Sequence, residues 1–426
     1  MTVASPSALS SPAMAGSGRD DARWQRIRED FPALARQVHG KPLVYLDNAN
    51  TGQRPLPVLA AIDRYYRHSN ANVSRAVHTL GSEATEAYEG ARDAMARFIA
   101  AGSRDEIVFT RGTTEGINLV AHSWGGQHIG AGDTVLLTMM EHHANIVPWQ
   151  LLCERVGARI EVVPIHDSGE LDLEAAERML TPQVKLFAFT HVSNALGTVN
   201  PVARLCALAR ERGITTLVDG SQAAPHLPLA VTELGCDFYV LTGHKMFGPT
   251  GSGVLWACRE TLAAMPPFMG GGEMIHEVSF KGTRFADPPH RFEAGTPNIA
   301  GIIGMGAAAQ YLEGIGMAAI QQRENALGGH ALERLQSVPG LRLIGQARER
   351  VPVFSFAIDG IQSSDLATMI DLEGVAVRSG HHCAHPLMQF YGLSATCRAS
   401  LAFYNTPAEI DALIAAIAKV RDLLVR

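Results

Sequence analysis

The middle of this 426-residue chain alternates short apolar runs, rich in β-branched residues, with amphipathic segments, and this alternation restricts the fold more than any other feature. Amphipathic stretches such as LEAAERML and VARLCALARERG lie between several of the runs. Strands that alternate with helices predict an α/β fold with a mainly parallel sheet covered by helices on both faces. In such sheets ligands bind beyond the carboxyl ends of the strands. The predicted strands are 106–110, 134–138, 159–165, 184–190, 215–219 and 237–242.

The chain ends on a segment with the start signals of a helix. Thr406 is predicted to cap it, Pro407 to occupy its first turn, and Glu409 to complete a capping box. Its apolar stripe contains Ile410, Leu413, Ile414, Ile417, Val420 and Leu424. An apolar-faced helix from about 298 to 314 and strand-like sequence around 351–358 come before it. Together these elements predict a smaller α+β domain.

The composition suggests four segments along the chain. Residues 1–22 are rich in Ser, Ala, Pro and Gly, and we expect them to form a disordered extension. Residues 23–45 are predicted to pack with the smaller domain, which covers 301–426. A large domain is predicted over 46–300.

Charge and hydropathy exclude two classes of protein. The net charge of -6 gives no reason to expect a nucleic-acid partner. No apolar run approaches the roughly 20 residues that span a bilayer, so no membrane association is expected. The N-terminal residues also lack the basic start and apolar stretch of a secretory signal. We therefore expect a cytoplasmic protein.

Six cysteines are scattered without CxxC spacing, which favours free thiols over a disulfide framework. Cys206 and Cys236 lie within or beside apolar runs and are expected to be inert core residues. Cys383 differs, because it lies among histidines in RSGHHCAHP (378–386). These residues by themselves permit two interpretations, a fragment of a metal site or a nucleophile on a loop.

The segment VLTGHKMFGPTGSGVLW (240–256) presents Lys245 among glycines directly after a predicted strand. A lysine in a loop is usually a surface charge. Here Gly243, Gly248, Gly251 and Gly253 indicate a close approach of the backbone to something else. A partly desolvated lysine has a lowered pKa and can form a Schiff base with a carbonyl cofactor.

Asp219 ends another predicted strand, 26 positions before Lys245, and Gln222 follows it. An acidic residue at a strand end is common and by itself a weak signal. Pyridoxal phosphate, however, needs a carboxylate beside its pyridinium nitrogen. A lysine and an aspartate on neighbouring strand ends meet that requirement.

Two further strand ends offer cofactor contacts. Arg111-Gly112-Thr113-Thr114 leads into a helix whose first N–H groups and threonine hydroxyls suit a phosphate, although an ordinary capped turn has the same pattern. In MMEHHANIVPW (139–149), His142 or His143 could stack on an aromatic cofactor. A metal is the weaker interpretation, because adjacent side chains on a strand point in opposite directions.

Ten motifs follow one another along the chain: YLDNANT (45–51), RAVHTLG (75–81), TRGTTEGIN (110–118), MEHHANIVPWQ (140–150), HVSNALGT (191–198), VDGSQ (218–222), TGHKMFGPTG (242–251), RFEAGTPN (291–298), RSGHHCA (378–384) and CRASLAFYNT (397–406). This ordered set resembles the cysteine desulfurases of the class V aminotransferase family, and within them the group II (SufS-like) enzymes of the SUF iron–sulfur assembly system. The resemblance extends from about residue 25 to the end of the chain. Two positions depart from the family pattern: Asn50 stands where alanine is usual, and Thr242 where serine is frequent.

The resemblance implies the fold type I of PLP-dependent transferases, with a seven-stranded sheet, and pyridoxal 5'-phosphate as the cofactor. Lys245 would be its Schiff-base lysine, Asp219 would pair with the pyridine nitrogen, and His142 would stack on the ring. Gln222 would contact the phenolic oxygen of the cofactor, and the phosphate would be bound by Thr114, Thr242 and His244, with Thr113 close by. Thr296 would contact the cofactor of the other subunit, which implies a homodimer. The substrate would be bound by Asn194, Arg398, His78 and Arg378.

The reaction that the resemblance implies converts L-cysteine to L-alanine. Lys245 would remove the Cα proton, and Cys383 would attack the substrate sulfur and keep it as a persulfide for a sulfur-acceptor protein. Arg378 and the neighbouring histidines are expected to favour the Cys383 thiolate. No metal is expected in this reaction.

Three alternatives remain open. The first is a selenocysteine lyase or a dual-substrate enzyme, which the pocket residues alone do not separate from a desulfurase. The second is another class V enzyme, such as an epimerase, kynureninase or transaminase, which would not need a nucleophilic Cys383. The third is a non-catalytic metal-binding or sulfur-carrier protein built around GHHCAHP, which would leave Lys245 and Asp219 unexplained.

Overall fold

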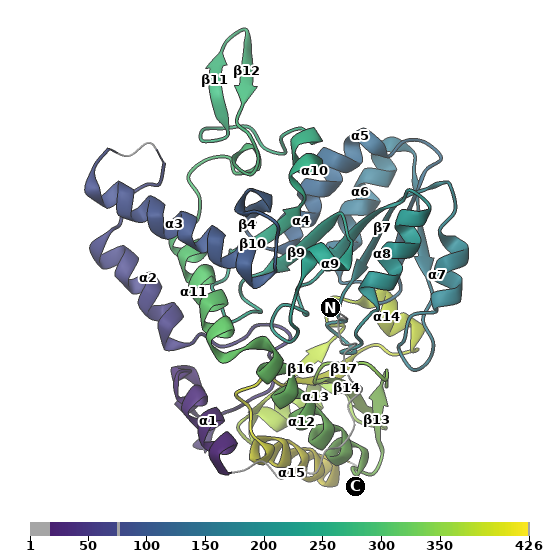
Figure 1. The fold of residues 1–426 in the computed structure, drawn as a ribbon. Helices are drawn as coiled ribbons and strands as arrows, with labels where there is room; N and C mark the ends of the chain where they lie inside the picture. Colours follow the sequence, from purple (N-terminus) through teal and green to yellow (C-terminus); the bar gives the residue numbers. More distant parts are fainter. Residues whose placement is uncertain (1–17, 75–76, 425–426) are drawn as a thin grey trace.

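A computed structural model describes residues 18–74 and 77–424. Its largest sheet has seven strands, and six of them are the six strands predicted from the sequence, with small changes at their ends (Figure 1). In spatial order the strands are β4 (Ile107–Thr110), β10 (Gly253–Ala257), β9 (Phe238–Thr242), β8 (Thr215–Asp219), β7 (Val184–Thr190), β5 (Thr134–Thr138) and β6 (Arg159–Val163).

The sheet is parallel except at β10. Strands β6, β5, β7, β8 and β9 pair in parallel, whereas β10 is antiparallel to both β9 and β4. A Cβ on Gly253, the first residue of β10, would lie 2.6 Å from the Cα of Gly112. Glycine is therefore required at Gly253 for this strand to approach the loop after β4.

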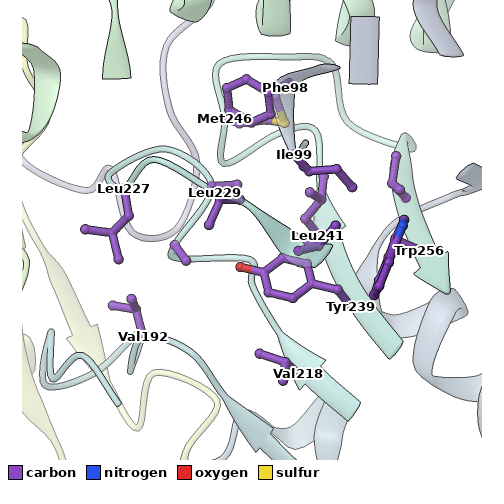
Figure 2. Packing of buried hydrophobic residues seen from close by; sticks show 14 of the residues in the cluster. Phe98, Ile99, Val192, Val218, Leu227, Leu229, Tyr239, Leu241, Met246 and Trp256 are labelled. Carbon is purple, nitrogen blue, oxygen red and sulfur yellow. The ribbon is translucent and has the colours of Figure 1, made fainter. Parts of the chain in front are cut away.

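Alternate residues of the strands enter two different hydrophobic cores. Leu217, Val240 and Leu255 face one core, together with residues of α4 (Thr113–Val120) and α6 (Val147–Val156). Their neighbours Val218, Tyr239, Leu241 and Trp256 face the other (Figure 2). A strand buried on both faces needs apolar residues at every position, which explains the unbroken apolar runs of the sequence.

Helices cover both faces of the large sheet, as predicted. The second core includes residues of α3, α8 and α11, and α11 packs against both α2 and α3 (Figure 1). The bounds of these helices and of their neighbours in the chain are α2 (Leu56–His68), α3 (Thr79–Phe98), α5 (Gly126–His128), α7 (Leu173–Met179), α8 (Val202–Glu211), α9 (Val231–Leu234), α10 (Arg259–Ala264), α11 (Ile299–Ile315) and α12 (Met317–Gln336).

A second sheet of four strands follows in the last third of the chain, in the order β13 (Leu341–Ile344), β14 (Val353–Ile358), β17 (Thr396–Ser400) and β16 (Arg378–Gly380). Its core is separate from those of the large sheet and includes residues of α12, α13 (Ser363–Asp371) and α15 (Pro407–Leu424). The predicted boundary between 300 and 301 falls inside α11, which packs against α2 and α3.

Helix α15 has the predicted capping box. The Glu409 N–H donates to the Thr406 hydroxyl at 3.3 Å, and the Thr406 N–H donates to the Glu409 carboxylate at 2.9 Å. The predicted apolar stripe is buried from Ile410 to Val420. The prediction is wrong for Leu424, which is exposed because the last turn of α15 extends past the core.

The N-terminal segment packs against the C-terminal part of the chain. Helix α1 (Gly18–Glu29) begins inside segment 1–22, for which the sequence predicts a disordered extension, and residues 1–17 lie outside the described residues. Strand β3 (Val44–Tyr45) pairs in parallel with β15 (Val375–Ala376). Arg28 of α1 forms an ion pair with Glu409 of α15 at 2.7 Å.

One hairpin, β11 (Ile275–Ser279) with β12 (Gly282–Phe285), projects away from the rest of the fold (Figure 1). Its residues are largely exposed, including the apolar side chains of Val278 and Phe280. The short strands β1 (Gln37–Val38) and β2 (Lys41–Pro42) form a second small pair. Across the described ranges, no helix combines the length and the apolar content that crossing a membrane requires.

Candidate active site

A cavity of about 1020 Å³ opens at the carboxyl ends of the large sheet, where the second sheet and its loops face it. The loops that follow β4, β5, β7, β8 and β9 all contribute to its lining, as does the loop after β16. Asn50, the departure from the family pattern, also lines it. The predicted site residues that it brings together are Thr113, Thr114, His142, Asn194, Asp219, Thr242, His244, Lys245, Arg378, Cys383 and Arg398.

Lys245 lies in the turn after β9, and this turn folds back on itself through backbone hydrogen bonds from Gly243 to Ser252 and from Gly248 to Gly243. Burial lowers the pKa of Lys245 to about 8, while the neighbouring charge of Asp219 acts in the opposite direction. A lysine with this pKa is about one-tenth uncharged near neutral pH, and the uncharged amine is the form that acts as a nucleophile or base.

Asp219 is buried at the end of β8, where its Oδ1 accepts a hydrogen bond from the Ser221 N–H at 2.9 Å. The Ser221 hydroxyl in turn lies 2.6 Å from that of Thr113, the first residue of α4. This contact joins the carboxylate of β8 to the start of the helix after β4. A negative group and a helix N-terminus with free N–H groups thus line the same cavity.

The turn into α4 is built for a close approach. Gly112 has φ 150 and precedes the helix, and a Cβ there would lie 3.3 Å from the Thr242 hydroxyl. Thr113 and Thr242 are buried, whereas Thr114 is exposed to the cavity. His244 adds a neutral ring, because burial, with the charge of Lys245, lowers its pKa to about 4.

His142 caps the short 3-10 turn η4 (His143–Asn145), and its Nδ1 accepts the Ala144 N–H at 3.0 Å. Burial and then the charge of Lys245 lower the pKa of His142 to about 3. Its ring is therefore neutral. Directly before it, the buried carboxylate of Glu141 accepts hydrogen bonds from the Thr190 N–H and the Asn145 amide, which holds η4 against β7.

Two arginines reach the cavity from the second sheet. Arg398 of β17 is buried; it donates to the Asn194 backbone oxygen at 2.9 Å and to Asp47 at 3.2 Å. Arg378 of β16 donates from its Nε to both oxygens of Asp47, each at 3.1 Å. Among the described residues, the Nε of Arg398 has no hydrogen-bond partner. A buried, unpartnered donor at a cavity suits a bound carboxylate.

Cys383 lies exposed on the loop between β16 and α14 (His385–Phe390). Both His382 and Cys383 have positive φ, at 54 and 55, which is unfavourable for residues other than glycine. The Asn194 amide donates to the His382 carbonyl at 2.6 Å, and His382 Nε2 lies 2.8 Å from the Thr396 hydroxyl. Asn194, predicted to bind substrate, therefore also holds this loop.

Three predicted site residues do not line the cavity. Gln222 is buried, and its amide donates to the Ala49 carbonyl at 2.5 Å. His78 is an exposed helix cap whose Nδ1 accepts the Gly81 N–H. Thr296 lines a separate hollow of about 450 Å³, which shares Arg111 with the cavity.

The family model for class-V aminotransferases matches residues 44–413 of this chain. The chain is 61% identical over 401 residues to a probable cysteine desulfurase of Xylella fastidiosa, covering 94% of this chain and 96% of the relative. The chain belongs to the cysteine desulfurases of the class-V aminotransferase family. A cysteine desulfurase of Klebsiella pneumoniae is 51% identical, with 94% and 98% of the two chains covered.

Solved structures of this family have the same fold. The cysteine desulfurase CsdA of Escherichia coli superposes with a TM-score of 0.88 at 37% identity, covering 94% of this chain and 99% of that one. The apo cysteine desulfurase of Thermococcus onnurineus gives 0.87 at 38% identity, with 93% and 98% covered. The predicted α/β fold is thereby confirmed, and so is the assignment to the cysteine desulfurases.

Three residues of the site were missed by sequence reasoning: Asp47, His143 and Ser221. Asp47 belongs to the YLDNANT motif, but nothing in the sequence indicates that it meets two arginines more than 300 positions later. Ser221 lies inside VDGSQ, two residues after Asp219, and this short spacing was the signal that its N–H could donate to the Asp219 carboxylate. His143 was considered only as an alternative to His142.

Proposed function

We propose that the chain is a group II cysteine desulfurase that uses pyridoxal 5'-phosphate and stores the substrate sulfur as a persulfide on Cys383. The main support is the position of Cys383. It is exposed on a loop that lines the same cavity as Lys245 and Arg398, and these are the three groups that the reaction needs. The relatives named cysteine desulfurase support the same substrate, L-cysteine.

The donors and acceptors of the cavity fit this cofactor. A lysine with a lowered pKa suits the aldehyde, the buried Asp219 suits the pyridinium nitrogen, and the start of α4 with Thr113, Thr114 and Thr242 suits the phosphate. The neutral ring of His142 suits stacking. Gln222 has an additional buried oxygen, Oε1, that no described residue pairs with.

When bound, the cofactor supplies an electron sink for the negative charge that develops at the substrate Cα. The residues of the chain perform the other tasks. Arg398 binds the substrate carboxylate, while hydrogen bonds to Asp47 and to the Asn194 carbonyl orient its guanidinium group. The uncharged Lys245 amine accepts the Cα proton. Cys383 Sγ then bonds to the substrate sulfur as the substrate C–S bond breaks, and alanine leaves.

The proposal includes a second subunit and a sulfur acceptor. Thr296 is exposed in a hollow that adjoins the cavity through Arg111, Glu115 and Gly251, which supports its contact with the phosphate of a partner's cofactor in a homodimer. An exposed persulfide must be passed on, so an acceptor protein of the SUF system, serving iron–sulfur cluster assembly, is part of the proposal. A selenocysteine lyase or dual-substrate enzyme is the second candidate, because selenium in place of sulfur would meet the same residues.

The first prediction tests the persulfide. Purified enzyme is given L-cysteine or L-selenocysteine, with and without a thiol reductant, and alanine and protein-bound sulfur are measured. Cys383→Ala should lose the protein persulfide and almost all alanine formation from L-cysteine, because no thiol remains to take the sulfur. Cys258→Ser, a change at a partly exposed cysteine outside the cavity, should behave as the wild type.

Two results would overturn the proposal. One is a normal rate of persulfide formation in Cys383→Ala. The other is that the wild-type enzyme forms alanine from neither L-cysteine nor L-selenocysteine. Alanine from L-selenocysteine alone would instead support the second candidate.

A further inference from the structure

The loop that carries Cys383 adopts an unfavourable backbone conformation. His382 and Cys383 are consecutive non-glycine residues with positive φ. Each such residue is disfavoured and persists only where the surrounding contacts hold it. Asn194 and Thr396 contact His382, the residue directly before Cys383 in the loop that leads to α14. The part of the loop from Cys383 to His385 needs a different support.

His143 supplies that support from the large sheet. Its backbone N–H donates to the Cys383 carbonyl at 2.8 Å. Its ring Nε2 accepts the backbone N–H of His385, the first residue of α14, at 3.1 Å. The ring also stacks on that of His385, with the centroids 5.1 Å apart and the planes 6° from parallel. One residue thus binds the backbone on both sides of the Cys383–His385 segment.

We propose that His143 is a positioning residue that fixes the Cys383 loop for sulfur transfer through the hydrogen bond from the His385 N–H to its ring. The inference rests on the proposed function, in which Cys383 takes the sulfur. Through η4, His143 is joined to His142, the residue proposed to stack on the cofactor. The same short turn therefore holds the ring-stacking histidine and the nucleophile loop in fixed relation, which sets the distance between cofactor and thiol.

The contact requires a neutral ring. An N–H can donate to His143 Nε2 only when that nitrogen carries no proton. Burial, followed by the nearby His385 and His381, lowers the pKa of His143, which keeps the acceptor available. Within the described ranges, no group of three or more His, Cys, Asp or Glu side chains is arranged to hold a metal ion, so a metal does not account for the neighbouring histidines.

Two variants separate the ring acceptor from the bulk of the side chain. His143→Leu removes the acceptor, and His143→Gln retains one, because its amide oxygen reaches the position of Nε2. Amide hydrogen exchange of the segment 383–385 is measured in the holoenzyme, together with kcat and KM for alanine formation. In His143→Leu, amide exchange of the segment should become about tenfold faster and kcat about tenfold lower, because one hydrogen bond to the loop is lost. The KM should be nearly unchanged, because the lost hydrogen bond does not involve the substrate carboxylate. Gln should restore both values to within about threefold of wild type.

The proposal would be overturned if the segment in His143→Leu exchanged its amide hydrogens at the wild-type rate. It would also be overturned if His143→Leu and His143→Gln changed the exchange rate and kcat equally. If the apolar side chain prevents folding, His143→Asn takes its place, because its shorter amide does not reach the His385 N–H. Hydrogen exchange reports on the loop whether or not Cys383 carries sulfur. A failure of the proposed function would appear instead in the Cys383→Ala experiment.

Discussion

At the scale of single residues, the site depends on charges held away from water. Lys245 and Arg398 both have lowered pKa values, with burial as the main cause, and Asp219 and Asp47 act against this effect. For Arg398 the shift leaves the guanidinium charged, because its ordinary pKa is far above neutrality. For Lys245 the pKa of about 8 brings the amine close to its working range. The same burial thus has a chemical consequence at the lysine and none at the arginine.

The lowered pKa of Lys245 predicts how the apoenzyme takes up its cofactor. Only the uncharged amine attacks the pyridoxal phosphate aldehyde, so the rate of covalent uptake should rise with pH to about 8 and then level off. An unperturbed lysine would show a rate that still increases between about pH 9 and pH 10. The absorbance of the covalent adduct, followed by stopped flow, measures this rate.

Lys245→Ala provides the background for that experiment, since it retains the cavity and loses the amine. A rate that keeps rising above about pH 9 would contradict the lowered pKa. A pH dependence unchanged in Lys245→Ala would show that the signal comes from another group.

Residues next to a strand end could be predicted from the sequence, and residues that meet through the tertiary fold could not. Lys245, Asp219 and Thr113 follow strands, and parallel strands place their carboxyl ends along one edge. Asp47 follows β3 and forms ion pairs with Arg378 and Arg398 of the second sheet, which line the cavity. No local pattern records an ion pair between such distant segments.

At the scale of helices and strands, the six buried strands were predicted well, because a short apolar run bounded by polar turns is typical of a buried strand. Strand β10 was not predicted as a separate element, because its short apolar run lies directly beside the glycine-rich turn that follows Lys245. Its antiparallel direction depends on Gly253 and Gly112 approaching each other, a contact between segments 141 positions apart (253 − 112). Pattern reasoning along the chain cannot detect such a contact.

The capping box of α15 gives a prediction at this scale. Thr406→Ala removes the hydroxyl that accepts the Glu409 N–H and should lower the free energy of unfolding by about 1 kcal/mol. Denaturant titration measures the change. Ser364→Ala is the matched control, because Ser364 is an exposed hydroxyl in the first turn of α13 that does not cap it. Equal losses in both variants would show that the cap contributes nothing specific.

At the scale of the whole molecule, the site is assembled from three parts of the chain. The large sheet supplies Lys245 and Asp219, the second sheet supplies Arg398, and Asp47, just after β3, forms an ion pair with Arg398. Strand β3 is held to the C-terminal part of the chain by its pairing with β15, and Asp47 forms a bridge with Ser400 of the second sheet. We therefore propose that the segment from about residue 23 to 45 belongs structurally with the C-terminal lobe.

The ion pair between Arg28 and Glu409 tests this association. Arg28 donates to both carboxylate oxygens of Glu409 and to the Tyr404 carbonyl, and both charged side chains are mostly buried. Arg28→Ala leaves Glu409 without its cation at the start of α15, so the free energy of unfolding should fall by about 2 kcal/mol, less than for a fully buried pair and more than for a surface pair.

Arg26→Ala is the matched control for that measurement. Arg26 lies on the same helix and is exposed, so its loss should change the free energy of unfolding by no more than about 0.5 kcal/mol. Hydrogen exchange then locates the effect: in Arg28→Ala the amides of α1 and of the first turn of α15 should exchange faster, while those of β8 and β9 should not change. Faster exchange in β8 and β9 instead would show that α1 supports the large sheet, and the N-terminal segment would then have to be assigned to the other lobe.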